Sequence, residues 1–128
     1  MKNLYNIIIS VVLASMILAI VSKTAIAQDV VKVAPGSYNV LLENDRVRVL
    51  EYRSKPGGKE PMHSHPASVI YVLSDAKVKF TLPDGKTTES ELKAGEVIWR
   101  EAETHAVENV GTTEAHVLII ELKETQKK

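Results

Sequence analysis

After residue 28, the sequence consists of short runs in which apolar and polar residues alternate, broken by turn-forming residues. Within residues 46–52, for example, Val47 and Val49 alternate with arginines. A period of two is typical of β-strands that have one buried face, and no helical period of useful length appears. The expected strands are 37–42, 46–52, 69–73, 77–82, 86–92, 97–99, 105–110 and 115–122. The chain is therefore predicted to be all-β.

Proline and glycine mark the breaks between these runs, at Lys55-Pro56-Gly57-Gly58, Pro83-Asp84-Gly85 and Ala94-Gly95. Many short strands separated by such signals favour a sandwich or a barrel. The polar, threonine-rich run 86–92 is expected to be an edge strand. Residues 30–33 are a candidate for one more edge strand.

The first 27 residues have the pattern of a secretory signal, which is expected to be helical. Lys2 precedes an uncharged stretch over residues 3–22, and Ala25 and Ala27 give the small-x-small ending that signal peptidases accept. Cleavage is predicted after Ala27, with a periplasmic or secreted location. The alternative is an uncleaved membrane anchor, since about 20 uncharged residues can span a bilayer.

Charge and cysteine content exclude several classes of protein. The whole chain has a formal net charge of zero, and no nucleic-acid partner is expected from such a balance. The chain has no cysteine, so a disulfide framework, a thiolate metal site and a cysteine nucleophile are excluded. The expected organisation is a signal peptide (1–27), an N-terminal extension or edge strand (28–39), a barrel (40–122) and a charged tail (123–128).

His63 and His65 are separated by one residue. On a strand, residues i and i+2 face the same side about 6–7 Å apart, so two imidazoles can converge on one ion. The alternative is a pair of unconnected surface histidines. His105 adds a third candidate ligand at the start of a later strand, and Asn109 follows it by four residues.

The spacings Gly57-x5-His63-x-His65 and Gly95-x9-His105-x3-Asn109 resemble the two motifs of the cupin superfamily. The resemblance covers about residues 40–122. It implies a double-stranded β-helix, the small jelly-roll barrel of cupins, with a metal ion inside.

Some positions of the cupin motifs differ in this chain. The glutamate of the first motif falls near Ser68 or Val69, and Arg100 and Ala102 replace the proline and glycine of the second. What remains is a three-histidine set, which is similar to that of some cupins that hold iron, the thiol dioxygenases among them. The resemblance implies a divalent metal on His63, His65 and His105. Iron is favoured, with zinc, manganese, nickel and copper as alternatives.

Two acidic residues before His105 could supply the missing carboxylate. Glu101 and Glu103 are candidates for a ligand or a general base, against the alternative of solvated loop charges. Glu60 is considered in the same way. Arg46, Arg48 and Arg53 are expected on a solvated face, unless one of them pairs with a substrate carboxylate.

Other residues are expected to be structural. His116 alternates with the apolar residues of the last strand, where it could point into the barrel. Asn109 is expected to anchor a loop through hydrogen bonds to the backbone. Aromatic residues of the strands are expected to pack in the barrel; these are Tyr52, Tyr71, Phe80 and Trp99.

The leading hypothesis is an exported small cupin that binds a divalent metal and carries out dioxygenase-type chemistry on a small molecule. Zinc or nickel would instead suit a lyase or an isomerase. The alternative is a non-catalytic periplasmic module that binds or senses a small molecule. A homodimer is a further expectation, and membrane contact is expected only through an uncleaved signal segment.

Overall fold

The structure is a computed structural model that describes residues 28–124. The predicted signal segment 1–27 and residues 125–128 lie outside the described residues, so the signal helix and its cleavage remain predictions. The described part contains one helical turn, α2 (Val30–Val33), and antiparallel strands. The strands are β1 (Tyr38–Glu43), β2 (Val47–Ser54), β3 (Lys59–His65), β4 (Ser68–Val72), β5 (Ala76–Thr81), β6 (Thr87–Leu92), β7 (Val97–Arg100), β8 (Glu103–Asn109) and β9 (Ala115–Leu122). The all-β prediction is confirmed.

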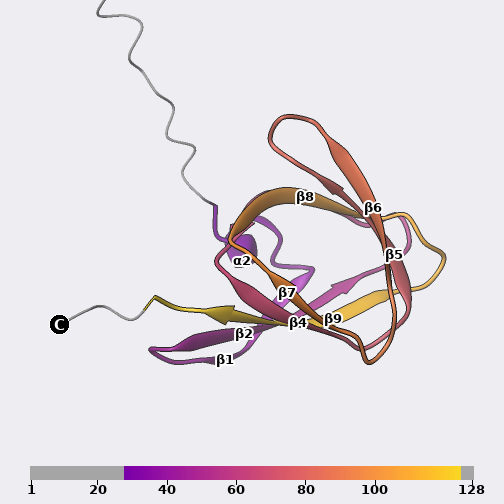
Figure 1. The fold of residues 1–128 in the computed structure, drawn as a ribbon. Coiled ribbons are helices and arrows are strands. Elements are labelled where there is room, and N and C mark those ends of the chain that lie inside the picture. The colour runs from indigo at the N-terminus through magenta and orange to yellow at the C-terminus, as the bar shows by residue number, and fades with distance from the viewer. Residues whose placement is uncertain (1–27, 125–128) are drawn as a thin grey trace, which may run out of the picture.

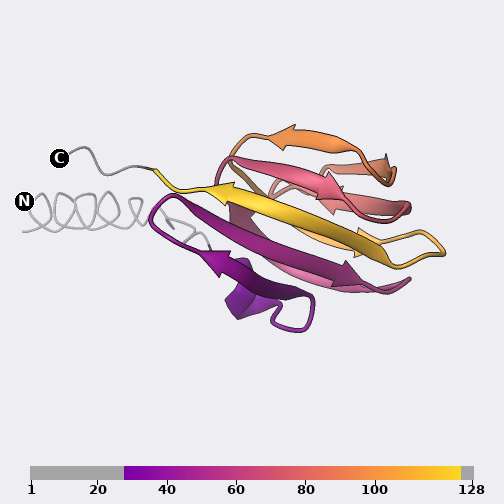
Figure 2. The same cartoon turned by 90° about the horizontal axis from the view of Figure 1, so that it is seen from below.

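The strands form two sheets, ordered β1-β2-β9-β4-β7 and β3-β8-β5-β6. Figure 1 shows the strands curving around a common interior, and Figure 2 shows them running alongside one another. The chain passes repeatedly from one sheet to the other, so strands far apart in sequence become neighbours. This crossing brings β3 and β8 together, although the histidines that they carry are about 40 residues apart in sequence. Strand β6, predicted to lie at an edge, is the last strand of its sheet.

The interior is filled by alternate residues of the strands. In β9, Ala115, Val117 and Ile119 are buried, and Leu50 and Tyr52 of β2 pack in the same core. Burying an aliphatic side chain of this size contributes about 1.5–3 kcal/mol. This apolar packing holds the strands in place and so fixes the positions of the polar residues at one end of the interior.

The outer face of the five-stranded sheet is also apolar. Val49, Ile120, Val69 and Trp99 lie opposite one another across four strands. Trp99 is 52% exposed and Tyr71 is 40% exposed, so the expectation that these two pack inside the barrel is wrong. Strands β4 and β7 carry apolar side chains on both faces. Their sequences therefore do not show which face is buried.

The predicted edge strand at residues 30–33 is instead the helical turn α2. The Asp29 side chain accepts a hydrogen bond from the Val31 amide, which caps the turn, and Val30 is fully buried. Just before this turn, Asp29 forms a parallel bridge with Ser64 of β3. No helix between residues 28 and 124 has the length and apolar character to cross a membrane.

Candidate metal centre

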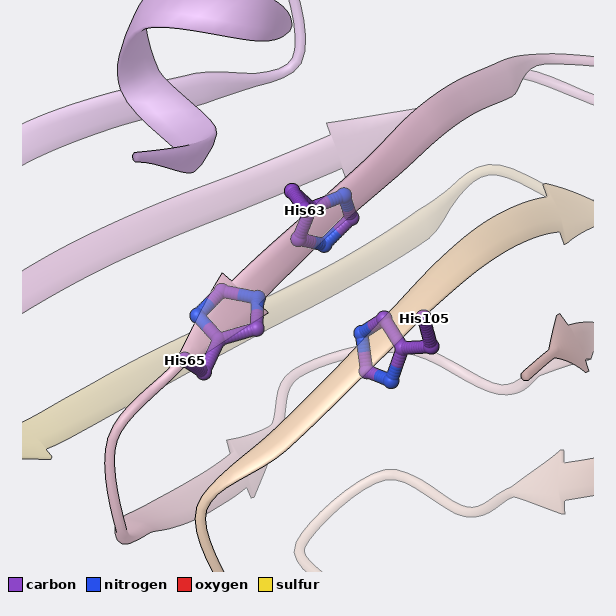
Figure 3. Close-up of side chains that lie close together, drawn as sticks. All are labelled: His63, His65 and His105. Atoms are coloured by element: carbon purple, nitrogen blue, oxygen red, sulfur yellow. The ribbon is translucent and has the colours of Figure 1, made fainter. Parts of the chain in front are cut away.

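Three buried histidines meet between strands β3 and β8. His63 and His65 lie on the buried face of β3, and His105 pairs with His63 in the β3–β8 register. The ring centroid of His63 is 4.9 Å from those of both His65 and His105. Figure 3 shows the three rings lying close together. One ring nitrogen of each residue lies within 4.8 Å of those of the other two. This cluster could hold a metal ion.

An irregularity in β3 places the histidines in the interior. Glu60 and His63 are three residues apart, so strict alternation would put them on opposite faces of the sheet. The β3–β8 register shifts between these two residues, and both are buried. The expectation that Glu60 is a solvated charge is therefore wrong. Its carboxylate accepts hydrogen bonds from the Ser37 and Tyr52 hydroxyls at 2.8 and 2.9 Å.

Two of the imidazoles are held in place through Nδ1. The Nδ1 atom of His63 lies 2.7 Å from the Pro61 carbonyl oxygen, and that of His65 lies 2.6 Å from Glu121 Oε1. Both partners are acceptors, so each Nδ1 carries a hydrogen and Nε2 is the nitrogen that can bind an ion. An acceptor behind the ring is the usual arrangement of a metal-binding histidine.

Glu121 is itself held by a basic side chain. Arg48 Nε donates to Glu121 Oε2 at 2.7 Å, and Arg48 Nη1 contacts the Asp29 carboxylate at 3.0 Å. Burial raises the pKa of the Glu121 carboxyl, but His65 and Arg48 outweigh this effect and hold the pKa below its usual value. Arg48 therefore pairs with carboxylates of the protein and does not lie on a solvated face.

His105 is supported less directly. Its Nδ1 atom is buried without a hydrogen-bond partner among the described residues, and Glu103 Oε1 lies 3.4 Å away. Glu103 in turn accepts two hydrogen bonds of 2.8 Å from Arg100. Burial raises the pKa of the Glu103 carboxyl, but His105 and Arg100 lower it to about 2. Glu103 is thus an ionised partner beside the cluster.

The second acidic candidate lies away from the cluster. Glu101 is exposed, and its carboxylate accepts a hydrogen bond from the Trp99 indole at 2.7 Å. The structure therefore brings Glu103 to the histidines and leaves Glu101 on the surface.

The protonation state of the cluster suits a metal. Burial lowers the pKa of His63 to about 4. The Pro61 hydrogen bond works against this shift, and the neighbouring His65 and His105 add to it. His63 is therefore neutral at pH 7 and needs no proton removed before it binds an ion. A neutral His63, together with the orientation of His63 and His65 through Nδ1, suits iron, zinc, copper or nickel.

A cavity of about 240 Å³ adjoins the cluster. His65 and His105 contribute to its wall beside largely apolar side chains, and Arg100 adds a charge. The Arg100 guanidinium lies 4.9 Å from the centre of the Phe80 ring and is held there by Glu103. The cavity therefore gives a small molecule access to the histidines.

Comparison with known protein families agrees with this architecture. The sequence model described as "Cupin domain" matches residues 50–121, which is more than half of the chain. The chain belongs to the cupin family. No curated protein is similar enough to this cupin to count as a match.

Solved structures give the same answer. A cupin domain from Bordetella pertussis is 31% identical, with a TM-score of 0.63, over 68% of this chain and 92% of that one. The polyketide cyclase RemF from Streptomyces resistomycificus is 28% identical, with a TM-score of 0.51, over 68% and 64%. An RmlC-like cupin from Methanocaldococcus jannaschii, described as a double-stranded β-helix, is 12% identical, with a TM-score of 0.55, over 67% and 78%. The expected double-stranded β-helix is therefore confirmed.

Two other candidates are structural in this cupin. His116 points away from the cluster, and its Nε2 atom lies 2.8 Å from Glu51 on the outer face. The inward residues of β9 alternate with it, so the idea that His116 faces the barrel interior is wrong. Asn109 anchors a loop as expected, because its Nδ2 donates to the Ser54 and Thr113 carbonyl oxygens at 2.8 Å.

Two residues at the cupin site are not among the sequence candidates. Glu121 lies on the same buried face of β9 as Val117 and Ile119, but both faces of this strand are apolar in sequence, so alternation gave no signal for it. Tyr38 is the buried residue of β1, and its hydroxyl lies 3.4 Å from His63 Nε2. Nothing in the spacing of Tyr38 from the histidines indicates this contact.

Proposed function

We propose that this cupin binds one divalent metal ion through His63, His65 and His105. The observation that carries the proposal is the convergence of three buried imidazoles, two of them oriented through Nδ1. Iron is the favoured ion, and zinc, manganese, nickel and copper are the alternatives. Binding has to draw the three nitrogens together, because two ligands of one tetrahedral ion at about 2.1 Å lie about 3.4 Å apart.

The cavity beside the cluster supports a small-molecule substrate. Its volume is about 240 Å³. Apolar residues such as Ile70, Val78 and Phe80 exclude water from much of its wall. Three neutral ligands leave the charge of a divalent ion uncompensated, which favours an anionic or enolate-like group next to the histidines.

The reaction that we propose is dioxygenation of this small molecule. A bound iron(II) ion would supply open positions for an oxygen-bearing substrate and an electron for O₂. The chain itself supplies orientation: Pro61 and Glu121 fix two imidazoles, and the apolar wall keeps bulk water from the substrate.

Two other functions remain as alternatives. One alternative is a lyase or an isomerase in which a bound zinc or nickel ion would act as a Lewis acid without O₂. The 28% identity to RemF, described as a polyketide cyclase, is compatible with a reaction other than dioxygenation. A non-catalytic binding or sensing module is favoured by a different observation. The carboxylates nearest the histidines are already paired, Glu103 with Arg100 and Glu121 with Arg48 and His65, so neither is a free general base.

Elemental analysis of untagged protein, purified without chelator, tests the metal site. Near-stoichiometric iron or another of the named metals supports the proposal, and protein that none of these ions can load overturns it. Oxygen uptake by the iron-loaded protein with candidate small molecules then separates the reaction classes. Turnover without oxygen uptake supports the Lewis-acid alternative. Ligand binding without turnover supports the sensing module.

We also propose that the protein is exported and forms a homodimer. The signal pattern of residues 1–27 supports export, which cell fractionation and N-terminal sequencing test. The outer face of the five-stranded sheet supports pairing with a second copy, because Val69, Ile120 and Trp99 form an apolar row that two identical faces can bury. Sedimentation of wild type and Trp99→Glu tests the dimer. A monomeric wild-type protein contradicts it.

A further inference from the structure

Tyr38 is placed beside the histidine cluster from a different strand. It is the first residue of β1 and is 4% exposed, whereas the rest of that strand is exposed. Its hydroxyl oxygen lies 3.4 Å from Nε2 of His63. That nitrogen is the one left free for an ion, because Nδ1 of His63 is directed at the Pro61 carbonyl oxygen.

The separation of 3.4 Å is long for a hydrogen bond. Typical O–H···N and N–H···O distances are about 2.7–3.2 Å. The same 3.4 Å is about the edge of a tetrahedron of ligands that surround one ion at about 2.1 Å. The Tyr38 oxygen and His63 Nε2 are therefore spaced as two ligands of a common ion would be.

The hydroxyl group of the neighbouring Tyr52 has a different partner from that of Tyr38. The rings of Tyr38 and Tyr52 are 4.8 Å apart, so both lie in the same part of the core. The Tyr52 hydroxyl donates to Glu60 Oε2 at 2.9 Å, a normal hydrogen bond. Within residues 28–124, the polar contact of the Tyr38 hydroxyl is the one with His63 Nε2 at 3.4 Å. Tyr38 is therefore directed at the cluster, and Tyr52 is directed at a carboxylate.

We propose that Tyr38 is a fourth protein ligand of the ion, through its phenolic oxygen. The proposal rests on the three-histidine site proposed above and adds an oxygen donor to it. Where the first cupin motif has its glutamate, this chain has Ser68 or Val69, so β4 supplies no carboxylate. Tyr38 on β1 would supply an oxygen instead, which becomes anionic on coordination. Coordination breaks the O–H bond, forms an O–metal bond and releases one proton to solvent, with no electron transferred.

The test is the visible spectrum of the full-length, untagged protein loaded with iron(II) without oxygen and then oxidised to iron(III) by ferricyanide. A phenolate bound to iron(III) gives a visible charge-transfer band, which imidazole ligands do not give. We expect this band in wild type and in Tyr52→Phe. We expect Tyr38→Phe to lose the band and to retain iron, because three histidines remain.

Two results would overturn the role of Tyr38. Iron-loaded wild type without the band shows that the phenol does not bind the ion, and a band that persists in Tyr38→Phe shows that it comes from another tyrosine. Either result leaves the three-histidine site intact. Resonance Raman spectroscopy tests the same point without a variant. Excitation within the wild-type band should enhance the ring vibrations of a phenolate if a tyrosine binds the ion. Protein that binds no iron overturns the proposal for Tyr38 as an iron ligand, and protein that none of the named metals can load overturns both proposals.

Discussion

Glu121 Oε1 lies 2.6 Å from His65 Nδ1, on the side of the imidazole opposite the proposed ion. The other oxygen of this carboxylate accepts a hydrogen bond from Arg48, which also contacts Asp29. The orientation of one candidate ligand therefore depends on side chains from β9, β2 and the cap of α2. Outer partners of this kind determine both the tautomer and the basicity of a ligating histidine.

Replacing Glu121 with glutamine should lower metal affinity by about 10–100-fold, because the ring keeps a weaker, neutral acceptor. Titration of the metal into the chelator-treated protein measures the change. Glu51→Gln is a matched control, since Glu51 accepts from His116 at 2.8 Å on the outer face. Equal affinities of Glu121→Gln and wild type would contradict the role of Glu121.

His63→Ala should abolish metal binding at the three-histidine site, because only two imidazoles remain and the Tyr38 oxygen loses the neighbouring ligand beside which it lies. Elemental analysis of the untagged variant provides the measurement. His116→Ala is the control and should keep full occupancy, since His116 lies outside the cluster. Full occupancy in His63→Ala would show that the ion, if present, binds elsewhere.

Neither Glu101→Gln nor Glu103→Gln should change metal occupancy. Glu101 is on the surface, and Glu103 is paired with Arg100 rather than directed at the ion. Elemental analysis of both variants measures this. Loss of metal from Glu103→Gln would mean that the missing carboxylate ligand comes from the second motif.

The metal-free protein should lose stability as the pH falls from about 6.5 to 4. Burial holds the pKa of His63 at about 4 in the folded state, against 6.5 ordinarily. His63 therefore takes up a proton at a higher pH in the unfolded chain than in the folded chain. The free energy of unfolding is highest above pH 6.5 and falls by about 3 kcal/mol by pH 4. Urea unfolding at a series of pH values measures the slope.

A variant separates this effect from other titrations. His63→Gln should flatten the slope between pH 6.5 and 4. The Glu103 carboxyl, with a pKa of about 2 against 4.5, should reduce stability only below about pH 4.5. If the pH dependence of the unfolding free energy is the same in His63→Gln as in wild type, the loss of stability comes from the titration of another group.

Asn109→Ala should destabilise the fold by about 1–3 kcal/mol, because it leaves buried backbone groups without partners. The Asn109 side chain donates to the Ser54 and Thr113 carbonyl oxygens and accepts from the Gly111 amide. Denaturant unfolding measures the loss. Thr112→Ala, at an exposed position of the same loop, should change stability by less than about 0.5 kcal/mol.

The histidine cluster was predictable because its signal is local. His63 and His65 share a face through strand alternation alone, and the second motif adds His105. Much of the strand pattern follows from the same alternation. These features depend on neighbouring residues and not on how distant strands pack.

The missed features depend on tertiary contacts. Strand β9 is apolar on both faces, so its sequence does not show that Glu121 points inward and His116 outward. Val30–Val33 fits a strand by composition, and only the Asp29 cap and burial of Val30 make it a helical turn. The position of Tyr38 depends on the packing of β1 against the barrel, which no local pattern specifies.

The segment just before α2 has a consequence beyond its hydrogen bonds. Strand β3 is the last strand of its sheet, and its Ser64 amide donates to the Gln28 carbonyl oxygen while Asp29 pairs beside it. An uncovered edge strand is a template on which another molecule can add a strand and aggregate. Strand β3 carries two of the three histidines, and residues 28 and 29 thus shield it from pairing with another molecule.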